Sequence, residues 1–277
     1  MPSPFFAEGL SMKPDTVFSL GGFEVTSSML VALITAGLII AVVQTAMRAP
    51  KLVPTGMQNF VEWVVESLAN LLEGIIGRKM MNSGFWFFAS IFVFILGCNL
   101  VSLLPGVGTF GLGQGEGWNF EVEHPYLRGA NADVNMTAAM AAVFFFLWFY
   151  WSFATVGPLG FISHIFGSKV SLDNAAANFA FRIIFFLVGI IEMVSILIIR
   201  PLAFTFRLYG NIYGGEYLLD SIYKMAPNFA FLLLVPFYFL ELLVAFIQAF
   251  VFCILTAVFT GIMVNSDDHP AEEGAHH

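Results

Sequence analysis

Long apolar runs separated by short polar segments dominate the pattern of this chain. A helix needs about 20 apolar residues to cross the roughly 30 Å hydrocarbon core of a bilayer. The runs that reach this length are Ser28–Met47, Gly84–Leu104, Val134–Val156, Asn178–Tyr223 and Asn228–Val264. Apolar and polar residues do not alternate in them as they do in strands of a membrane β-barrel. The pattern therefore predicts an all-α membrane protein with about five transmembrane helices.

The last two runs exceed the length of a simple crossing. At 1.5 Å per residue they would extend roughly 55–70 Å as helices. Either each run holds two short spans, or each forms one long and strongly tilted helix. The strong break between them is "DSIYKMAPN", Asp220 to Asn228. We therefore favour two long tilted helices that form a hairpin, with Pro201 and Pro236 as candidate kinks.

A segment between the first two spans has a two-sided pattern. In "TGMQNFVEWVVESLANLLEGIIGRKM" apolar residues recur at helical spacing, while amides and acids such as Gln58, Glu62 and Glu66 occupy the other side. This pattern predicts an amphipathic helix that lies at the membrane interface or against other helices.

The composition agrees with a membrane protein. The chain of 277 residues is 58% hydrophobic and 11% charged, whereas soluble domains carry about 25% charged residues. Cys98 and Cys253 lie in apolar runs and are expected to be packing residues. The beginning of the chain lacks the pattern of a cleavable signal peptide. We expect residues 1–277 to form a single integral-membrane domain.

Basic residues are distributed unevenly between the loops. Those between the first and second spans are Arg48, Lys51, Arg78 and Lys79. The loop after the second span has only Arg128. Because basic loops stay on the cytoplasmic side, we expect residues 1–27 to form an external segment and residues 266–277 to form a polar cytoplasmic tail.

Charged side chains interrupt the last two spans. They are Arg182, Glu192, Arg200, Arg207, Glu216 and Asp220 in the fourth span and Glu241 in the fifth. Arg207 and Glu241 have long apolar flanks on both sides, so their charged groups are not expected to reach the interface. Burying such a charge costs from about 2.5 to more than 10 kcal/mol, and such residues usually mark ion pathways. A structural salt bridge would also explain them.

The spacing assigns these polar groups to helix faces. Asn211 follows Arg207 by four residues, and Gln248 follows Glu241 by seven, so each pair shares a face. In an antiparallel hairpin Gln248 can approach Arg207 while Glu241 lies toward Glu216. A fixed cation would then be separated along the hairpin from carboxylates that can exchange protons. The glycines of "GNIYGG" would let a neighbouring helix approach closely, or serve packing alone.

The stretch "PLAFTFRLYGNIYGGE" resembles the signature of subunit a of the F-type ATP synthase. Further segments are similar to that family in the same order: "VPTGMQNFVEWVVESL", "LGCNLVSLLPG", "ADVNMTAAMA" and "IQAFVFCILTAVF". The resemblance covers roughly residues 40–265 and is most specific in the arginine motif.

The resemblance implies roles for individual residues. Arg207 matches the family's essential arginine, which faces the ring of c subunits and separates two aqueous half-channels. Gln248 matches the glutamine that packs near this arginine. Four more residues match polar positions of the half-channel that opens to the proton-rich side: Glu216, Glu241, Asn211 and Asp133.

The family also implies a setting. The chain would be a non-catalytic, proton-translocating subunit in a bacterial inner membrane, and proton flow past it would turn the c ring and drive ATP synthesis. Its expected partners are the c ring, the b-subunit peripheral stalk, the remaining ATP synthase subunits and the lipid bilayer. ATP chemistry would reside on those partners, and no cofactor, metal ion or nucleic acid is expected.

Two departures from the family pattern stand out. Many bacterial relatives carry one acid and one histidine where this chain has Glu216 and Glu241. Glu192 precedes Pro201 by nine positions, where the family usually has eight. The extra residue falls in "SILII" and predicts a local bulge in the helix, which leaves the direction of Glu192 open.

Two other classes of protein were considered. A secondary transporter with an Arg/Glu binding site would show two similar halves with broken helices in matching places, yet the arginine motif occurs once. An intramembrane enzyme would need a catalytic motif, and neither HExxH nor GxSxG is present.

Overall fold

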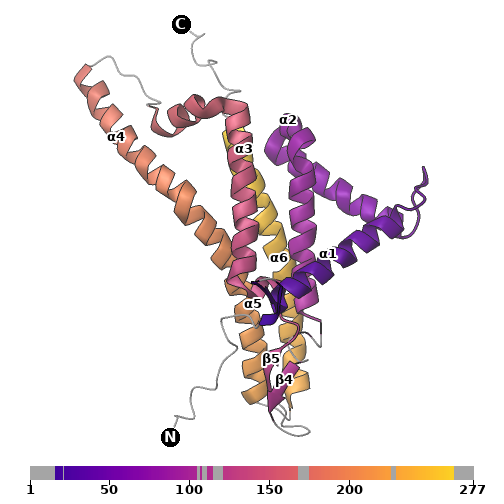
Figure 1. Ribbon diagram of the computed structural model, residues 1–277. Helices are drawn as coiled ribbons and strands as arrows, with labels where there is room; N and C mark the ends of the chain where they lie inside the picture. The colour runs from indigo at the N-terminus through magenta and orange to yellow at the C-terminus, as the bar shows by residue number, and fades with distance from the viewer. Residues whose placement is uncertain are drawn as a thin grey trace, which may run out of the picture.

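The computed structural model describes residues 16–20, 22–104, 107, 111–114, 121–167, 175–225 and 229–264. The helices are α1 (Ser27–Ala46), α2 (Met57–Ser102), α3 (Val134–Phe166), α4 (Ala175–Val194), α5 (Arg200–Met225) and α6 (Ala230–Val264), with a π-helical turn η3 (Ser195–Ile199) between α4 and α5 and a 3-10 turn η2 (Ala130–Ala132) before α3. Figure 1 shows that α3, α6 and part of α2 run side by side, while α4 extends away from them.

Helices long and apolar enough to cross a membrane confirm the predicted spans. Within the described residues they are Ser27–Ala46, Met80–Ser102, Val134–Phe166, Phe181–Met225 and Phe231–Val264. The fourth is continuous from α4 through η3 into α5, and α5 packs against α6. The fold class is therefore the expected all-α membrane protein, with its last two spans paired as a hairpin.

The predicted amphipathic helix and the second span belong to one long element. α2 runs from Met57 to Ser102 but bends at Gly77, whose φ of 75° and ψ of 159° lie outside the helical region. Glycine adopts a positive φ without the steric cost that other residues meet. The two limbs of α2 that meet at this corner are visible in Figure 1.

The end of the third span differs from the expectation. The predicted span ended at Val156, so that Pro158, His164 and Lys169 would lie in a loop beyond it, but the helical segment continues to Phe166 after a sharp turn at Gly157, where φ is 76°. Pro158 follows directly, and proline suits the first position of a helix because its missing N–H needs no partner there. Pro158 and His164 therefore lie on helix, and Lys169 is outside the described residues.

Two short antiparallel hairpins were not predicted. One pairs β1 (Thr16–Leu20) with β2 (Phe23–Thr26), and the other pairs β4 (Gly111–Gln114) with β5 (Glu121–Pro125). The second hairpin leads into η2 and thereby into the start of α3.

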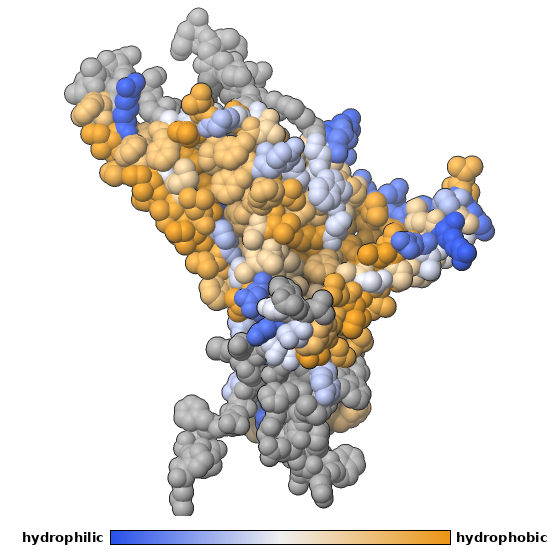
Figure 2. Space-filling view, viewed as in Figure 1, coloured by the Kyte–Doolittle hydropathy of each residue, from blue (hydrophilic) through white to orange (hydrophobic). Residues whose placement is uncertain are grey.

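The core is rich in aromatic side chains. Phe88 of α2, Phe144 of α3 and Phe252 of α6 are fully buried, and Phe204 of α5 packs on both Phe144 and Phe252 at centroid distances of 5.7 and 5.0 Å. Most large apolar side chains of α4 are instead exposed, and they form an apolar edge in Figure 2. Exposure of such an apolar surface to water is unfavourable, so lipid or a partner protein is expected to cover it.

Candidate functional site: a buried acid cluster and an exposed arginine

Glu241 and Glu216 meet at the contact between α5 and α6. The Glu241 side chain is buried and lies directly against Gly215, because a Cβ built on Gly215 would overlap its carboxylate. Glu216 follows Gly215 in the chain and interacts electrostatically with Glu241. The helix pair thus brings the two acids of the predicted site together.

The segment before α3 covers the other side of Glu216. A Cβ built on Gly129 would lie 2.5 Å from Glu216 Oε1 and 2.7 Å from Ser102 Oγ at the end of α2. Ser102 itself donates a hydrogen bond to the Cys98 carbonyl at 2.8 Å. The Glu216 carboxylate therefore lies against the segment before η2, close to the end of α2, and the residue as a whole is half-buried.

Two buried asparagines connect this segment to α6. Asn131 Nδ2 donates to Asn99 Oδ1 at 2.6 Å, and Asn99 Nδ2 donates to the Ala245 carbonyl at 3.0 Å. Both asparagines are fully buried, and Ala245 lies one helical turn beyond Glu241. This amide chain therefore links η2, α2 and α6 beside the acids. The sequence did not predict a role for Asn99 or Asn131. A signal was present for Asn99, because it is a polar amide inside an apolar run.

Asp133 closes the cluster at the start of α3. Its side chain is 1% exposed, and Oδ1 accepts a hydrogen bond from the Asn135 N–H at 2.9 Å, which caps the helix. Burial raises the pKa of Asp133, while the hydrogen bond from Asn135 and the charge of Arg128 lower it. Asp133 thus caps α3 and also brings a carboxyl group near Arg128 and Tyr209.

Arg207 lies on a different kind of surface. The residue is exposed, with its guanidinium carbon 5.9 Å from the centre of the Phe204 ring. The exposed side chains near it in sequence, Leu202 and Phe206, are apolar. An arginine on an apolar membrane face is costly unless a partner compensates its charge.

The two predicted amides occupy the helices between these features. Gln248 is buried and Asn211 is half-buried. The Nε2 of Gln248 and the Nδ2 of Asn211 have no hydrogen-bond partner within the described part of the chain. Buried polar groups usually bond to protein or ordered water, so both amides are suited to contact water or a second subunit.

The predicted bulge before α5 is confirmed as the π-helical turn η3, over the residues "SILII". Because Pro201 lacks an N–H, the carbonyl of Leu197 loses its α-helical donor, and the wider turn occurs at that point. Arg200, next to it, stacks its guanidinium on the Phe259 ring of α6 at 4.5 Å, and Glu192 acts on it electrostatically. A second charged group therefore lies on the other side of Arg207 from the acid cluster.

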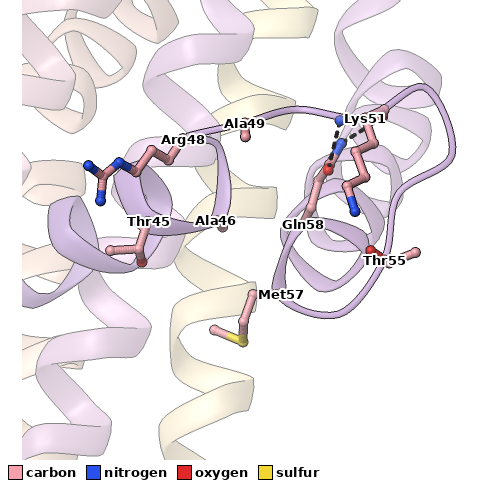
Figure 3. A pocket seen from close by; sticks show the side chains of 8 residues that line it. All are labelled: Thr45, Ala46, Arg48, Ala49, Lys51, Thr55, Met57 and Gln58. Atoms are coloured by element: carbon pink, nitrogen blue, oxygen red, sulfur yellow. Dashed lines mark hydrogen bonds between the residues drawn. The ribbon is translucent and has the colours of Figure 1, made fainter.

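A pocket of about 470 Å³ occurs at the far end of α1 from the acid cluster. It is lined by Thr45, Ala46, Arg48, Ala49, Lys51, Thr55, Met57 and Gln58, as Figure 3 shows. The Gln58 side chain bonds the backbone of Lys51, accepting at 3.1 Å and donating at 2.9 Å. No group of three or more His, Cys, Asp or Glu side chains that could hold a metal ion occurs among the described residues.

Comparisons with known proteins show the family of this chain. A family model described as ATP synthase A chain matches residues 26–261. The ATP synthase subunit a of Rhodococcus erythropolis is 28% identical, with 92% of this chain and 88% of the relative covered. That of Moorella thermoacetica is also 28% identical, covering 92% and 98%, and that of Solidesulfovibrio magneticus is 32% identical, covering 85% and 83%. The chain therefore belongs to the ATP synthase A chain family, whose model matches most of its length.

Proposed function

We propose that this chain forms two half-channels which, together with Arg207, couple proton flow to rotation of a c ring and so to ATP synthesis. The family supports a proton-translocating stator role. The observation that carries the finer proposal is the contrast between an exposed arginine on an apolar face and a buried acid cluster on the same helix pair.

Arg207 faces the ring in this proposal. A ring carboxylate that passes it would exchange its proton for an ion pair with the guanidinium, which compensates the charge that the membrane face leaves exposed. Because a guanidinium does not give up its proton in proteins, it would remain a fixed barrier to direct proton flow between the two half-channels.

The acid cluster supplies the external half-channel. Glu216 lies nine residues after Arg207, about 13 Å along a helix, and it meets Glu241 at the Gly215 contact. Two neighbouring carboxylates share protons rather than ionise fully together, so Glu216 and Glu241 would pass protons toward the ring. Asn211 and Gln248, with buried N–H groups, would hold water between the acids and Arg207.

The second half-channel would open on the other side of Arg207. Arg200 and Glu192 are charged groups there, and the uneven loop charges support a cytoplasmic location of that side. The c ring would cover the exposed face of α5, and the b-subunit peripheral stalk would hold the chain in the inner membrane of a bacterium. ATP chemistry would then reside on the partner subunits.

Replacement of Arg207 tests the proposal. In the intact complex reconstituted into vesicles, Arg207→Ala should abolish proton-driven ATP synthesis, a loss of at least about 100-fold if the fixed charge is the barrier. Arg207→Lys should substitute poorly, because an ammonium loses its proton more readily when desolvated.

Arg182→Ala is the matched control, since Arg182 is another exposed arginine of the same span but lies near its end. This variant should retain synthesis close to that of the unaltered complex. Normal synthesis by the Arg207→Ala complex, with the c ring still bound, would show that the proposal is wrong.

A further inference from the structure

Arg128 is a buried cation beside the acid cluster, and the proposed function leaves it without a role. The residue is 3% exposed. It lies between β5 and η2, in a segment whose next residue, Gly129, contacts Glu216. The turn η2 that follows packs against α1, α2 and α5. Arg128 is therefore inside the helix assembly rather than in a solvated loop.

The charges around Arg128 belong to the proposed external path. Arg128 interacts electrostatically with Glu216, with Asp133 and with Tyr209. A buried guanidinium is costly unless negative groups surround it, and these carboxyl groups supply that environment. Because arginine stays protonated in proteins, its charge is constant over the pH range in which the acids exchange protons.

Resting on the proposed function, we propose that Arg128 is a second fixed cation that acts as a positioning residue for the external half-channel, keeping one negative charge in the acid cluster so that a proton can be passed on to the ring. Glu216 and Glu241 alone would repel each other if both were ionised. With Arg128 beside them one carboxylate can remain charged while the other carries the proton. The cluster then accepts and releases single protons.

The direction of the expected pH effect follows from the pKa of Asp133. Burial raises the pKa of Asp133, and the charge of Arg128 opposes that rise. Removing the cation should therefore raise the pKa of Asp133 further, so that Asp133 holds its proton to a higher pH. The titratable groups that interact electrostatically with Arg128 are Asp133 before α3 and Tyr209 and Glu216 on α5. Glu216 interacts in turn with Glu241 on α6, and Tyr209 with Tyr213 on α5.

The test replaces Arg128 in the intact complex, reconstituted into proteoliposomes at a fixed membrane potential. Proton-driven ATP synthesis is measured while the pH on the external side is varied. Arg128→Gln, which keeps polarity but removes the charge, should slow synthesis several-fold and move its half-maximal pH upward by about one unit. Arg128→Lys, which keeps the charge, should retain the original pH profile.

A double change separates an electrostatic role from a structural one. In a complex that already carries Glu216→Gln, adding Arg128→Gln should have much less effect on synthesis than it has alone, because the carboxylate through which it acts is gone. Effects that simply multiply would overturn the proposal, and so would an Arg128→Gln complex with the unaltered pH profile. If Arg128→Gln does not assemble with the ring, the Lys variant decides, and a Lys variant with the same defect overturns the proposal.

Arg207→Ala, assayed in the same preparation, distinguishes failure of the proposal for Arg128 from failure of the proposed function. Loss of synthesis in that variant together with an unaltered Arg128→Gln complex would refute only the role of Arg128. Normal synthesis in Arg207→Ala would refute the proposed function itself.

Discussion

At the scale of single residues, the acid pair depends on a missing side chain. Gly215 gives the Glu241 carboxylate its place, since a Cβ there would overlap it. The neighbouring Gly214 has no atom within 4 Å of where its Cβ would be. Two adjacent glycines of the same motif are thus expected to differ in their tolerance of a methyl group.

Gly215→Ala should displace Glu241 and slow proton-driven synthesis by about ten-fold or more, because a misplacement of about 1 Å near the reacting groups can cost ~100-fold. Gly214→Ala is the matched control and should remain close to the unaltered protein. Synthesis rates in vesicles, normalised to the amount of c ring that co-purifies, provide the measurement. Equal rates for the two alanine variants would contradict the assigned contact.

The residues of the candidate site differ in how far the sequence could predict them. Arg207 and Glu241 were found because long apolar flanks leave a charge no route to the interface. The glycine cluster indicated close helix packing but not that Gly215 faces Glu241, because that contact depends on the rotation of two helices. Asn99 and Arg128 were missed as site residues, since Ala245, which Asn99 bonds, and Glu216, with which Arg128 interacts, lie far away in the chain.

At the scale of elements, η3 sets the rotation of α4 relative to α5. A π-helical turn carries one residue more than the α-helix it replaces, and each residue corresponds to about 100° of rotation. The extra residue over Ser195–Ile199 therefore determines which way Glu192 points relative to Arg207.

Deleting Leu197 should convert the bulge to regular helix and turn Glu192 away from Arg200. We expect ATP-driven proton pumping to fall several-fold while the c ring remains bound, because the change acts on the side of Arg207 where the second half-channel is proposed. Leu197→Ala keeps the residue count and serves as the control. Pumping that the deletion leaves intact would show that the rotation of α4 is unimportant.

The elements themselves were largely predictable, and the departures have physical causes. Apolar length alone located the spans. The predicted end of the third span coincides with the turn of α3 at Gly157 and Pro158. The same pair can also begin a new helical segment, and the local sequence does not distinguish these two outcomes. The strands of the hairpins β1–β2 and β4–β5 are only four or five residues long, too short for a clear period-two pattern, so the sequence did not predict them.

At the scale of the whole molecule, the loop charges imply one orientation in the membrane. Cysteines introduced at Gln114 and Lys224 should react with an impermeant thiol reagent from outside intact cells. Cysteines at Lys51 and Ser266 should react only in inverted vesicles. The native Cys98 and Cys253 are buried, so their background labelling should be low. External labelling at Ser266 would overturn the five-span topology.

The amide chain from Asn131 through Asn99 to Ala245 also has a mechanical meaning. If a ring turns against α5 and α6, these helices carry a sideways load with every step, and a loose helix would yield to it instead of holding the acids in place. Hydrogen bonds buried in a medium of low dielectric are strong, and this chain ties α6 to α2 one turn from Glu241. Under the proposed function the chain would thus be braced at the height where the proton path meets the moving surface, so that torque would be transmitted to the ring rather than absorbed by bending.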